Sequence, residues 1–539
     1  MLEQERDPST LYRRITHSKR YDRLRRLRMS EHIALLIGTF SVVVQAGFAG
    51  ISDPRIAEVS WLVLSCLAWI SISRLARSRL QLPAPVGALP TGKTSLALPG
   101  LWLIGLVVVP LFRGQLSIWD SLLAWSDSLL GLMAVVTVLS GFRELAGRTH
   151  NSAILLVGSF LALIFVGTLL LRLPVCRAVT AENPGGEGAD WNVALFTATS
   201  AACVTGLIVE PTGSYWTPMG HAVIFTLFQV GGLGILTFGA FIAVLSGRRG
   251  MQFREARTLS EVLDAENVHG SRRLLLTILL FTLSVEAVGA LLLSGLWEDK
   301  GLSSLQQVWY SVFHSVSAFC NAGFALRTES LVTLQDTWCV YLSIMPLIII
   351  GGLGFPALQD LWANLLAWIR VRRGHRGPRY RLRLHTRIVL ITTVLLIVGG
   401  AGFLYLFETI GPQTPLSSID PHSMAGMGTF ARVRAALFQS VTARTAGFNT
   451  VPIDINSMSP ASHALLMMLM FVGGSPASTA GGIKAAALAV LLLSVIGTLR
   501  RRNRAEAFGR TVPLAVIERA GVVVILMGAL VAITTLGLL

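Results

Sequence analysis

The sequence predicts an all-α polytopic membrane protein, built from tandem units of a membrane helix, a short pore helix and a second membrane helix. The composition is 53% hydrophobic and only 14% charged. Apolar runs near the ~20 residues that cross a bilayer recur about eleven times. Short glycine loops recur at nearly constant spacing, which indicates pseudo-symmetry of the units around an axis.

The apolar runs and the charges between them predict the topology. The +16 net charge lies mainly in alternate loops, which are the N-terminus and residues 74–93, 143–148, 248–273, 370–387 and 500–510. The positive-inside rule then places the N-terminus in the cytoplasm and the glycine loops toward the outside, and the charge does not indicate a nucleic-acid surface. The runs lie near residues 32–51, 58–74, 97–113, 121–141, 153–173, 219–246, 274–296, 338–369, 388–410, 461–497 and 514–538.

The five cysteines show neither a disulfide framework nor metal-ligand spacing. Each is expected to be a small buried apolar residue. The basic N-terminus precedes a long apolar run without a small-residue cleavage site, so no signal peptide is predicted.

Three loops with one glycine each are the main repeated feature. Gly206 and Gly323 are 117 residues apart, and Gly323 and Gly447 are 124 apart. The segments before them, near residues 191–203, 305–319 and 430–443, have ~12–15 residues, too few to span a bilayer. Each fits a re-entrant helix whose negative C-terminal end favours a cation.

Loops of this kind are suited to binding a dehydrated cation. Backbone carbonyls replace the water shell of K⁺ only if they all point inward, which glycine permits and β-branched residues resist. The alternative is that the glycines serve close helix packing. That reading is favoured for one glycine but not for three at matched positions.

Three motifs in order closely resemble the Trk/Ktr/HKT superfamily of K⁺ transporters, and the resemblance covers roughly residues 150–539. They lie at residues 315–324, 442–450 and 473–484. The resemblance implies four joined repeats around a pseudo-four-fold pore, with Gly206 at the position that accompanies K⁺ preference. It also implies a homodimer, a cytoplasmic ring of nucleotide-binding regulatory subunits and a bacterial inner-membrane location. The lipid bilayer is the other expected partner, and no covalently bound cofactor is expected.

The residues expected to act on the ion form three groups. The K⁺ filter is assigned to Val204, Thr205, Gly206, Cys320, Asn321, Ala322, Gly323, Thr445, Ala446 and Gly447. By resemblance, the gate is the intramembrane loop containing Gly473, Gly474, Ser475, Pro476, Ser478, Thr479, Gly481 and Gly482, where helix breakers are dense. The ionisable residues assigned to pore electrostatics are Lys484, Arg444 and Glu286.

Alternatives remain for the charged residues. Lys484 either repels cations, pairs with an acid such as Glu286, or extends its amine toward the cytoplasm. Arg444 is expected to brace the structure rather than contact the ion, and His314 to be a packing residue with satisfied hydrogen bonds.

These features divide the chain into a series of regions. They are a basic cytoplasmic tail (1–31), an accessory region of four membrane helices (32–150), pore repeats 1 (151–250), 2 (251–372) and 3 (373–498, with the gating loop 473–484), and the first helix of an incomplete repeat 4 (499–539). A fourth filter glycine is expected near position 564 to 571 from the ~117–124-residue spacing, beyond Leu539. We therefore expect a truncated sequence rather than a working pore of three repeats.

The rival functions are a non-conducting relative that acts as a membrane scaffold and a Na⁺-conducting member. An intramembrane enzyme is not expected, because no HExxH or GxSxG motif is present. The GxxxxGK[ST] match at residues 87–94 lies in a short proline-rich loop, and residues 45–48 resemble a filter without a preceding short helix. Both matches are interpreted as incidental.

Overall fold

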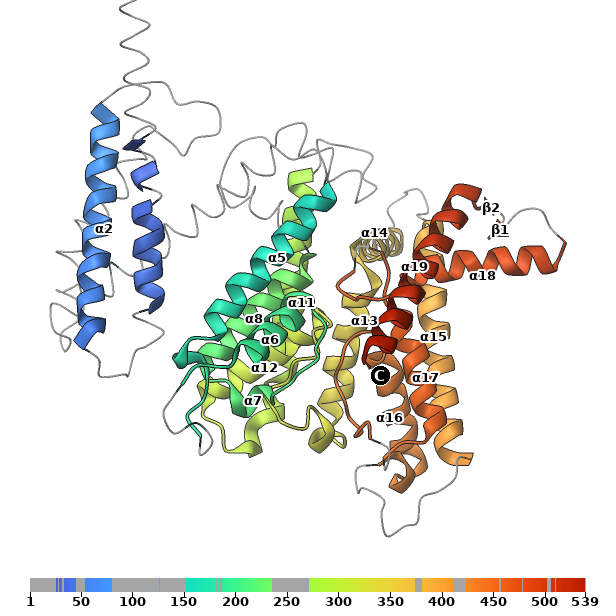
Figure 1. Cartoon of the computed structure of the whole chain (residues 1–539). Coiled ribbons are helices and arrows are strands. Elements are labelled where there is room, and N and C mark those ends of the chain that lie inside the picture. Colours follow the sequence, from blue (N-terminus) through green and yellow to red (C-terminus); the bar gives the residue numbers. More distant parts are fainter. Residues whose placement is uncertain are drawn as a thin grey trace, which may run out of the picture.

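The computed structural model describes residues 26–27, 29–31, 33–44, 54–79, 126, 152–180, 183, 187–234, 271–373, 381–410, 423–454, 457–476, 478–501, 506–508 and 510–538. The described part is almost entirely helical, so the predicted all-α class is confirmed (Figure 1). The runs near 97–113 and, apart from Ser126, 121–141 lie outside the described residues. Residues 45–48 and 87–94 also lie outside them.

The first repeated unit contains α5 (Ser152–Leu171), α6 (Trp191–Ala202) and α8 (Pro218–Gly232), with the one-turn helix α7 (Thr212–Tyr215) before α8. A 3₁₀ turn, Pro174–Cys176, follows α5. The start of α8 is fixed locally, because the hydroxyl of Thr217 accepts a hydrogen bond from the Gly220 amide at 3.3 Å. Pro218 occupies the first helical turn, where no amide hydrogen is needed.

The second unit contains α11 (Ser271–Leu293), α12 (Ser304–Phe319), α13 (Met345–Leu353) and α14 (Phe355–Arg372). Ser303 and Gln306 form a capping box at the start of α12 and satisfy two backbone amides reciprocally. This fixes the start of the short helix within one residue of the predicted position. The shorter helical segments are the 3₁₀ turns Ser294–Lys300 and Val332–Leu334 and the π-helical turn Val340–Ile344.

The third unit contains α15 (Leu384–Ile410), α16 (Thr429–Thr442), α17 (Pro460–Phe471) and α18 (Ala485–Leu499). A 3₁₀ turn, Met424–Gly426, precedes α16. The chain breaks between α17 and α18, and Figure 1 shows α18 running at a steep angle to α17 rather than continuing it. After α18 come the two-residue antiparallel strands β1 (Glu506–Ala507) and β2 (Arg510–Thr511), then α19 (Leu514–Leu538).

The N-terminal described helices pair separately. Residues 33–44 are helical and pack against α2 (Pro54–Arg79) through a small apolar cluster that includes Leu35, Val63 and Leu67. The four-helix accessory region stays a prediction, since the rest of it lies outside the described residues.

The prediction that the apolar run at 338–369 forms a single membrane span is wrong. Val340–Leu353 and Phe355–Arg372 meet at 105°, at Gly354, whose φ of 79° only glycine adopts readily. Trp362 and Trp368 are exposed on α14, and the Arg372 guanidinium lies 4.2 Å from the Trp368 ring centroid. Exposed tryptophan beside arginine is typical of a helix at a membrane interface.

Within the described residues, three helices are long and apolar enough to cross a membrane: Leu276–Trp297, Leu384–Ile410 and Leu514–Gly537. The bent pair adds a fourth if it is counted as one broken span.

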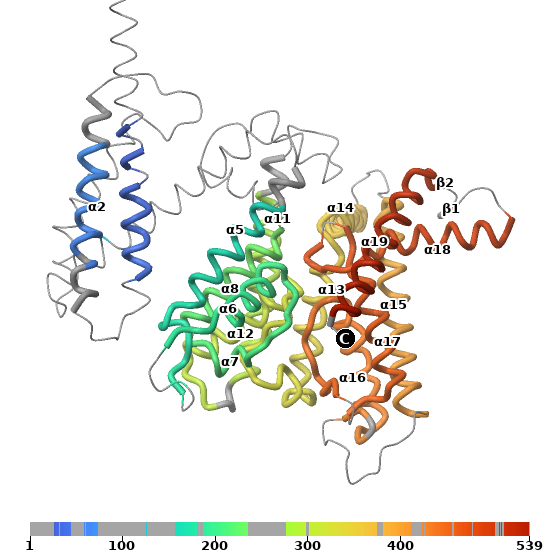
Figure 2. The backbone as a smooth tube through the Cα atoms, in the orientation of Figure 1, coloured from blue at the N-terminus to red at the C-terminus, as the bar shows by residue number. Residues whose placement is uncertain are grey.

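The main core joins the first two units and extends to the third. Phe228 of α8 packs edge-on against Phe313 of α12, with ring centroids 5.3 Å apart, and stacks on Phe324 at 6.1 Å. Phe438 of α16 and Phe448 after it belong to the same core. Figure 2 shows α6, α8, α11 and α12 grouped together. The short helices are therefore held by buried aromatic packing, and the loops that follow them are fixed in place.

Candidate functional site: three converging glycine loops

Each short helix ends in a loop with two left-handed residues separated by one residue of negative φ. The pairs are Val204 and Gly206 (φ 56° and 77°), Asn321 and Gly323 (57° and 71°), and Thr445 and Gly447 (72° and 81°). In an extended strand successive carbonyls alternate sides, whereas alternating the sign of φ turns them toward one side. The loops thus have a conformation suited to carbonyl coordination.

From the sequence, only the glycine of each loop was expected to adopt an unusual backbone conformation. The second is occupied by valine, asparagine or threonine, although a β-branched residue at positive φ is a genuine outlier. Such strain costs roughly 1–3 kcal/mol per residue and persists only where the surroundings enforce it. It therefore marks these loops as functional candidates.

The amide groups of the loops donate hydrogen bonds to carbonyls of the short helices, whereas the loop carbonyls accept none from the described residues. Thr205 donates to the Ser200 carbonyl at 2.7 Å, and Ala322 donates to the Ser317 carbonyl at 2.8 Å. In the third loop Ala446 donates to Thr442 at 2.9 Å. Among the described residues, no hydrogen-bond donor is bonded to the carbonyls of residues 204–206, 320–323 or 445–447. These oxygens are available to a ligand.

The three glycines converge, with Gly323 in the middle. A Cβ added at Gly323 would lie 2.8 Å from the Ala446 oxygen, 3.0 Å from the Gly447 Cα and 3.3 Å from the Gly206 Cα. A Cβ at Gly206 would lie 2.5 Å from the Ala322 oxygen. Segments more than 100 residues apart in sequence (~117 or more by the repeat spacing) therefore meet at one place.

Further glycines allow helices to pack directly behind the loops. A Cβ at Gly231 of α8 would collide with the Ala202 carbonyl, and one at Gly351 of α13 would collide with the Phe319 carbonyl. Both carbonyls belong to the last residue of a short helix. Close packing, the alternative considered for the loop glycines, thus applies to these positions.

The segment 472–484 between α17 and α18, which contains the predicted intramembrane loop, lies against the second and third loops. The Thr479 hydroxyl donates to the Phe319 carbonyl at 2.9 Å and accepts from Asn321 Nδ2 at 2.8 Å. The Gly481 amide donates to Thr445 Oγ1 at 3.0 Å. The predicted helix break is confirmed, and the ends of the segment are joined by a bridge between Val472 and Ile483.

The middle of this segment is also fixed to α13. The Ser475 amide donates to the Gly352 carbonyl at 2.9 Å, and the Thr479 amide donates to the Gly351 carbonyl at 3.3 Å. A Cβ at Gly474 would lie 2.7 Å from the Gly352 oxygen. Of the other predicted gate residues, Gly473 packs on Gly481, Gly482 is left-handed (φ 65°), and Pro476 and Ser478 lie between the anchored ends.

The three ionisable residues do not pair with one another. The buried Arg444 guanidinium donates to the Gly473 carbonyl at 3.1 Å, and Lys484 Nζ donates to the Ala480 carbonyl at 2.7 Å. Glu286 accepts from Gln229 Nε2 at 3.1 and 3.2 Å instead of contacting Lys484. The Lys484–Glu286 pair considered from the sequence is therefore wrong, because each side chain has a nearer partner.

Glu286 lies behind the second loop. Only 4% of its surface is exposed, and its Oε1 lies 4.0 Å from the Cys320 sulfur, at the first residue of that loop. Ser315 donates to the Glu286 carbonyl at 2.7 Å, just as Ser440 donates to the Ile397 carbonyl at 2.8 Å. The matching position in the third unit is thus isoleucine, so the third unit has no carboxylate at this place.

The other assignments can be compared directly with the structure. His314 is fully buried, with Nδ1 2.7 Å from the Tyr310 carbonyl and Nε2 3.3 Å from the Leu326 amide, so its role as a satisfied packing residue is confirmed. All five cysteines are free. Cys203, which follows the last residue of α6, is exposed, and Cys339 is only partly buried, so the expectation that every cysteine is buried is wrong for these two.

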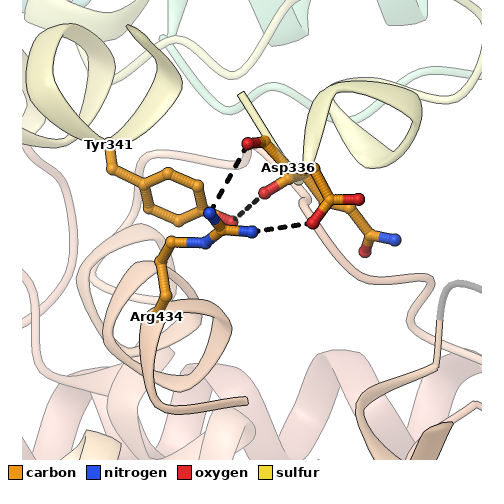
Figure 3. A network of polar contacts seen from close by, with 4 residues as sticks. Asp336, Tyr341 and Arg434 are labelled. Atoms are coloured by element: carbon orange, nitrogen blue, oxygen red, sulfur yellow. Dashed lines mark hydrogen bonds and ion pairs between the residues drawn. The ribbon is translucent and has the colours of Figure 1, made fainter. Parts of the chain in front are cut away.

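A polar network that the sequence did not reveal joins the second and third units. Arg434 on α16 forms an ion pair with Asp336 at 2.8 Å, and its guanidinium lies 4.7 Å from the Tyr341 ring centroid (Figure 3). The Tyr341 hydroxyl donates to the Gln335 carbonyl at 2.7 Å. The sequence shows Asp336 in a loop between two apolar runs, but nothing local to it indicates that Arg434 is its partner.

Comparison with known proteins identifies the family. The model described as "TrkH: Cation transport protein" matches residues 142–522. The chain belongs to this family. As a TrkH-family member it is a multi-pass membrane protein of the transporter class and not an enzyme.

Relatives of this TrkH-family chain include proteins from several bacteria. It is 35% identical over 367 residues to the "Potassium/sodium uptake protein NtpJ" of Enterococcus hirae, covering 68% of this chain and 74% of that protein. It is 34% identical over 396 residues to the "Ktr system potassium uptake protein B" of Vibrio alginolyticus, covering 74% and 80%. The solved potassium transporter TrkH from Vibrio parahaemolyticus is similar with a TM-score of 0.48 and 19% identity, covering 84% of this chain and 81% of that one.

Proposed function

We propose that the protein is the pore-forming subunit of a K⁺ uptake system, in which backbone carbonyls of residues 204–206, 320–323 and 445–447 bind dehydrated K⁺. The single observation that carries this proposal is the convergence of three left-handed loops whose carbonyls are unbonded. Carbonyl oxygens held around an axis replace the hydration shell of a monovalent cation. The names of the relatives, which are potassium or potassium/sodium uptake proteins, support the same ion class.

The arrangement supports passive movement of the ion along its electrochemical gradient. From the loops K⁺ would pass the segment 473–482, which acts as the gate because it lies against two of the three loops. Arg444 braces this gate, and Lys484 caps its inner end. The three pore repeats are then residues 151–250, 251–372 and 373–498.

The proposed setting is a bacterial inner membrane, with the N-terminus in the cytoplasm and the chain paired as a homodimer. A nucleotide-binding regulatory subunit would attach to the cytoplasmic face. The name "Ktr system" given to relatives supports an assembly of more than one component. Cross-linking in native membranes, followed by mass spectrometry of the captured chains, tests both partners.

An uptake assay tests the ion function. We expect K⁺ uptake by cells that lack their own K⁺ transporters when they produce the wild-type protein, and loss of that uptake in Gly323→Asp. The matched control is Gly301→Asp, since Gly301 has nearly the same φ (69° against 71°) but, among the residues that the structure describes, no atom within 4 Å of an added Cβ. Equal uptake by wild type and Gly323→Asp contradicts the proposal and favours a membrane scaffold.

A further inference from the structure

The intramembrane segment is bonded to two of the three loops at the residue that is most strained in each. Asn321 and Thr445 are the non-glycine left-handed residues of the second and third loops, and both make side-chain hydrogen bonds to this segment. Since a non-glycine residue keeps a left-handed conformation only where its surroundings enforce it, these bonds stabilise the loop conformation.

The first loop is held in a different way. Val204 has no polar side-chain atom, and its Cγ2 lies 3.0 Å from the position of a Cβ at Gly231 in α8. Packing against α8 therefore fixes the first loop, whereas hydrogen bonds from the segment 472–484 fix the second and third.

Thr479 is the central residue of this contact. Its hydroxyl group donates a hydrogen bond to the Phe319 carbonyl at 2.9 Å and accepts one from the Asn321 side-chain amide at 2.8 Å. Phe319 is the last residue of the short helix α12, and Asn321 is two residues before Gly323. The hydroxyl thus bridges the end of the helix to the start of the candidate filter strand.

We infer that Thr479 is a positioning residue for ion selectivity, which holds the second filter strand in its carbonyl-inward conformation from the gate side. The inference rests on the proposed function. It makes the gate and the filter one coupled unit: when the segment moves away from the second and third loops, these two strands lose their supports and the first does not. Selectivity then depends on a residue that contacts no ion.

The test measures the K⁺/Na⁺ permeability ratio of the full-length protein in proteoliposomes, alongside the amount of protein incorporated. Thr479→Val removes the hydroxyl at nearly constant volume, and we expect the ratio to fall about fivefold or more, as two lost hydrogen bonds predict. Thr479→Ser keeps the hydroxyl and is expected to stay within about twofold of wild type. Thr212→Val is the matched control, because it makes the same chemical change on α7, outside the filter and the gate, at a buried hydroxyl that has no hydrogen-bond partner among the described residues. We expect it to leave the ratio unchanged.

A double-mutant comparison isolates the contact itself. If Thr479 acts through Asn321, Thr479→Val changes the ratio by less than about twofold in an Asn321→Ala background. Additive effects, or an unchanged ratio in Thr479→Val, overturn the inference.

A filter variant separates this failure from failure of the proposed function. Gly206→Ser alters the filter directly, in a strand that the segment does not support, and is expected to lower the ratio. If Gly206→Ser changes the ratio and Thr479→Val does not, only the inference is wrong. If neither changes it, the filter assignment is wrong, and the inference with it.

Discussion

Adding a single methyl group at Gly323 perturbs the proposed filter in a way whose size follows from the structure. Any residue with a Cβ pays about 1–2 kcal/mol for the left-handed conformation. At Gly323 the methyl group also meets the Ala446 oxygen at 2.8 Å and the Gly447 Cα at 3.0 Å. Since both are backbone atoms, a neighbouring loop must move, and overpacking of this kind costs typically about 1–3 kcal/mol more.

Comparison with Gly301→Ala separates the cost of the left-handed conformation from the cost of the clash between loops. Gly301 has a φ of 69°, but no atom of the described residues lies within 4 Å of an added Cβ, so alanine there meets only the conformational cost. Gly447→Ala is intermediate, because within the described part of the chain the Gly323 Cα, at 3.0 Å, is the only atom within 3.5 Å of its added Cβ.

Initial rates of Rb⁺ uptake, normalised to the protein in the membrane, measure the effect. We expect Gly323→Ala to lose at least about tenfold in rate, which corresponds to about 1.4 kcal/mol, and Gly301→Ala to stay within about twofold of wild type. Gly447→Ala should fall between them. Equal rates for Gly323→Ala and Gly301→Ala refute the reasoning, because the clash between loops would then have no consequence for the ion path.

Four further predictions concern residues around the loops and between the second and third units. Glu286→Gln replaces the ionisable carboxyl group behind the second loop while keeping the side-chain shape, so we expect a several-fold higher KM for K⁺ uptake, and an unchanged KM assigns Glu286 a packing role only. Arg434→Leu should cost roughly 1–2 kcal/mol in unfolding free energy, because two aromatic contacts are lost with the ion pair. Asp336→Asn should cost under about 1 kcal/mol, since 84% of the Asp336 side chain is exposed, and equal melting shifts for the two variants contradict this ranking. Shortening residues 473–482 should raise flux and lower the K⁺/Na⁺ ratio together, whereas lower flux indicates a scaffold role for the segment.

Local features of the fold could be predicted from the sequence. The observed helices α6, α12 and α16 agree with the predicted short helices within one residue, because length, capping residues and the glycine that follows are all local signals. The helix break at 473–484 was predicted for the same reason, since proline and glycine disrupt the helical hydrogen bonds wherever the segment lies. The family, too, was identified from three local motifs.

Features that depend on packing between distant segments could not be predicted. Nothing local marks Val204 as left-handed, because its conformation is enforced by α8. Pairing Glu286 with Gln229, rather than with Lys484, depends on where α8 and α11 meet. The bend at Gly354 was missed for another reason: Gly354 and Pro356 are local helix breakers, but the run around them is apolar enough to be interpreted as one span.

The most direct test of the central claim is to locate the ion. A structure determined with Rb⁺ or Tl⁺ in place of K⁺ should show a strong anomalous peak between residues 204–206, 320–323 and 445–447, within coordination distance of their backbone oxygens. An ion held instead by side-chain carboxylates, or no ion between these loops at saturating Rb⁺, contradicts the account.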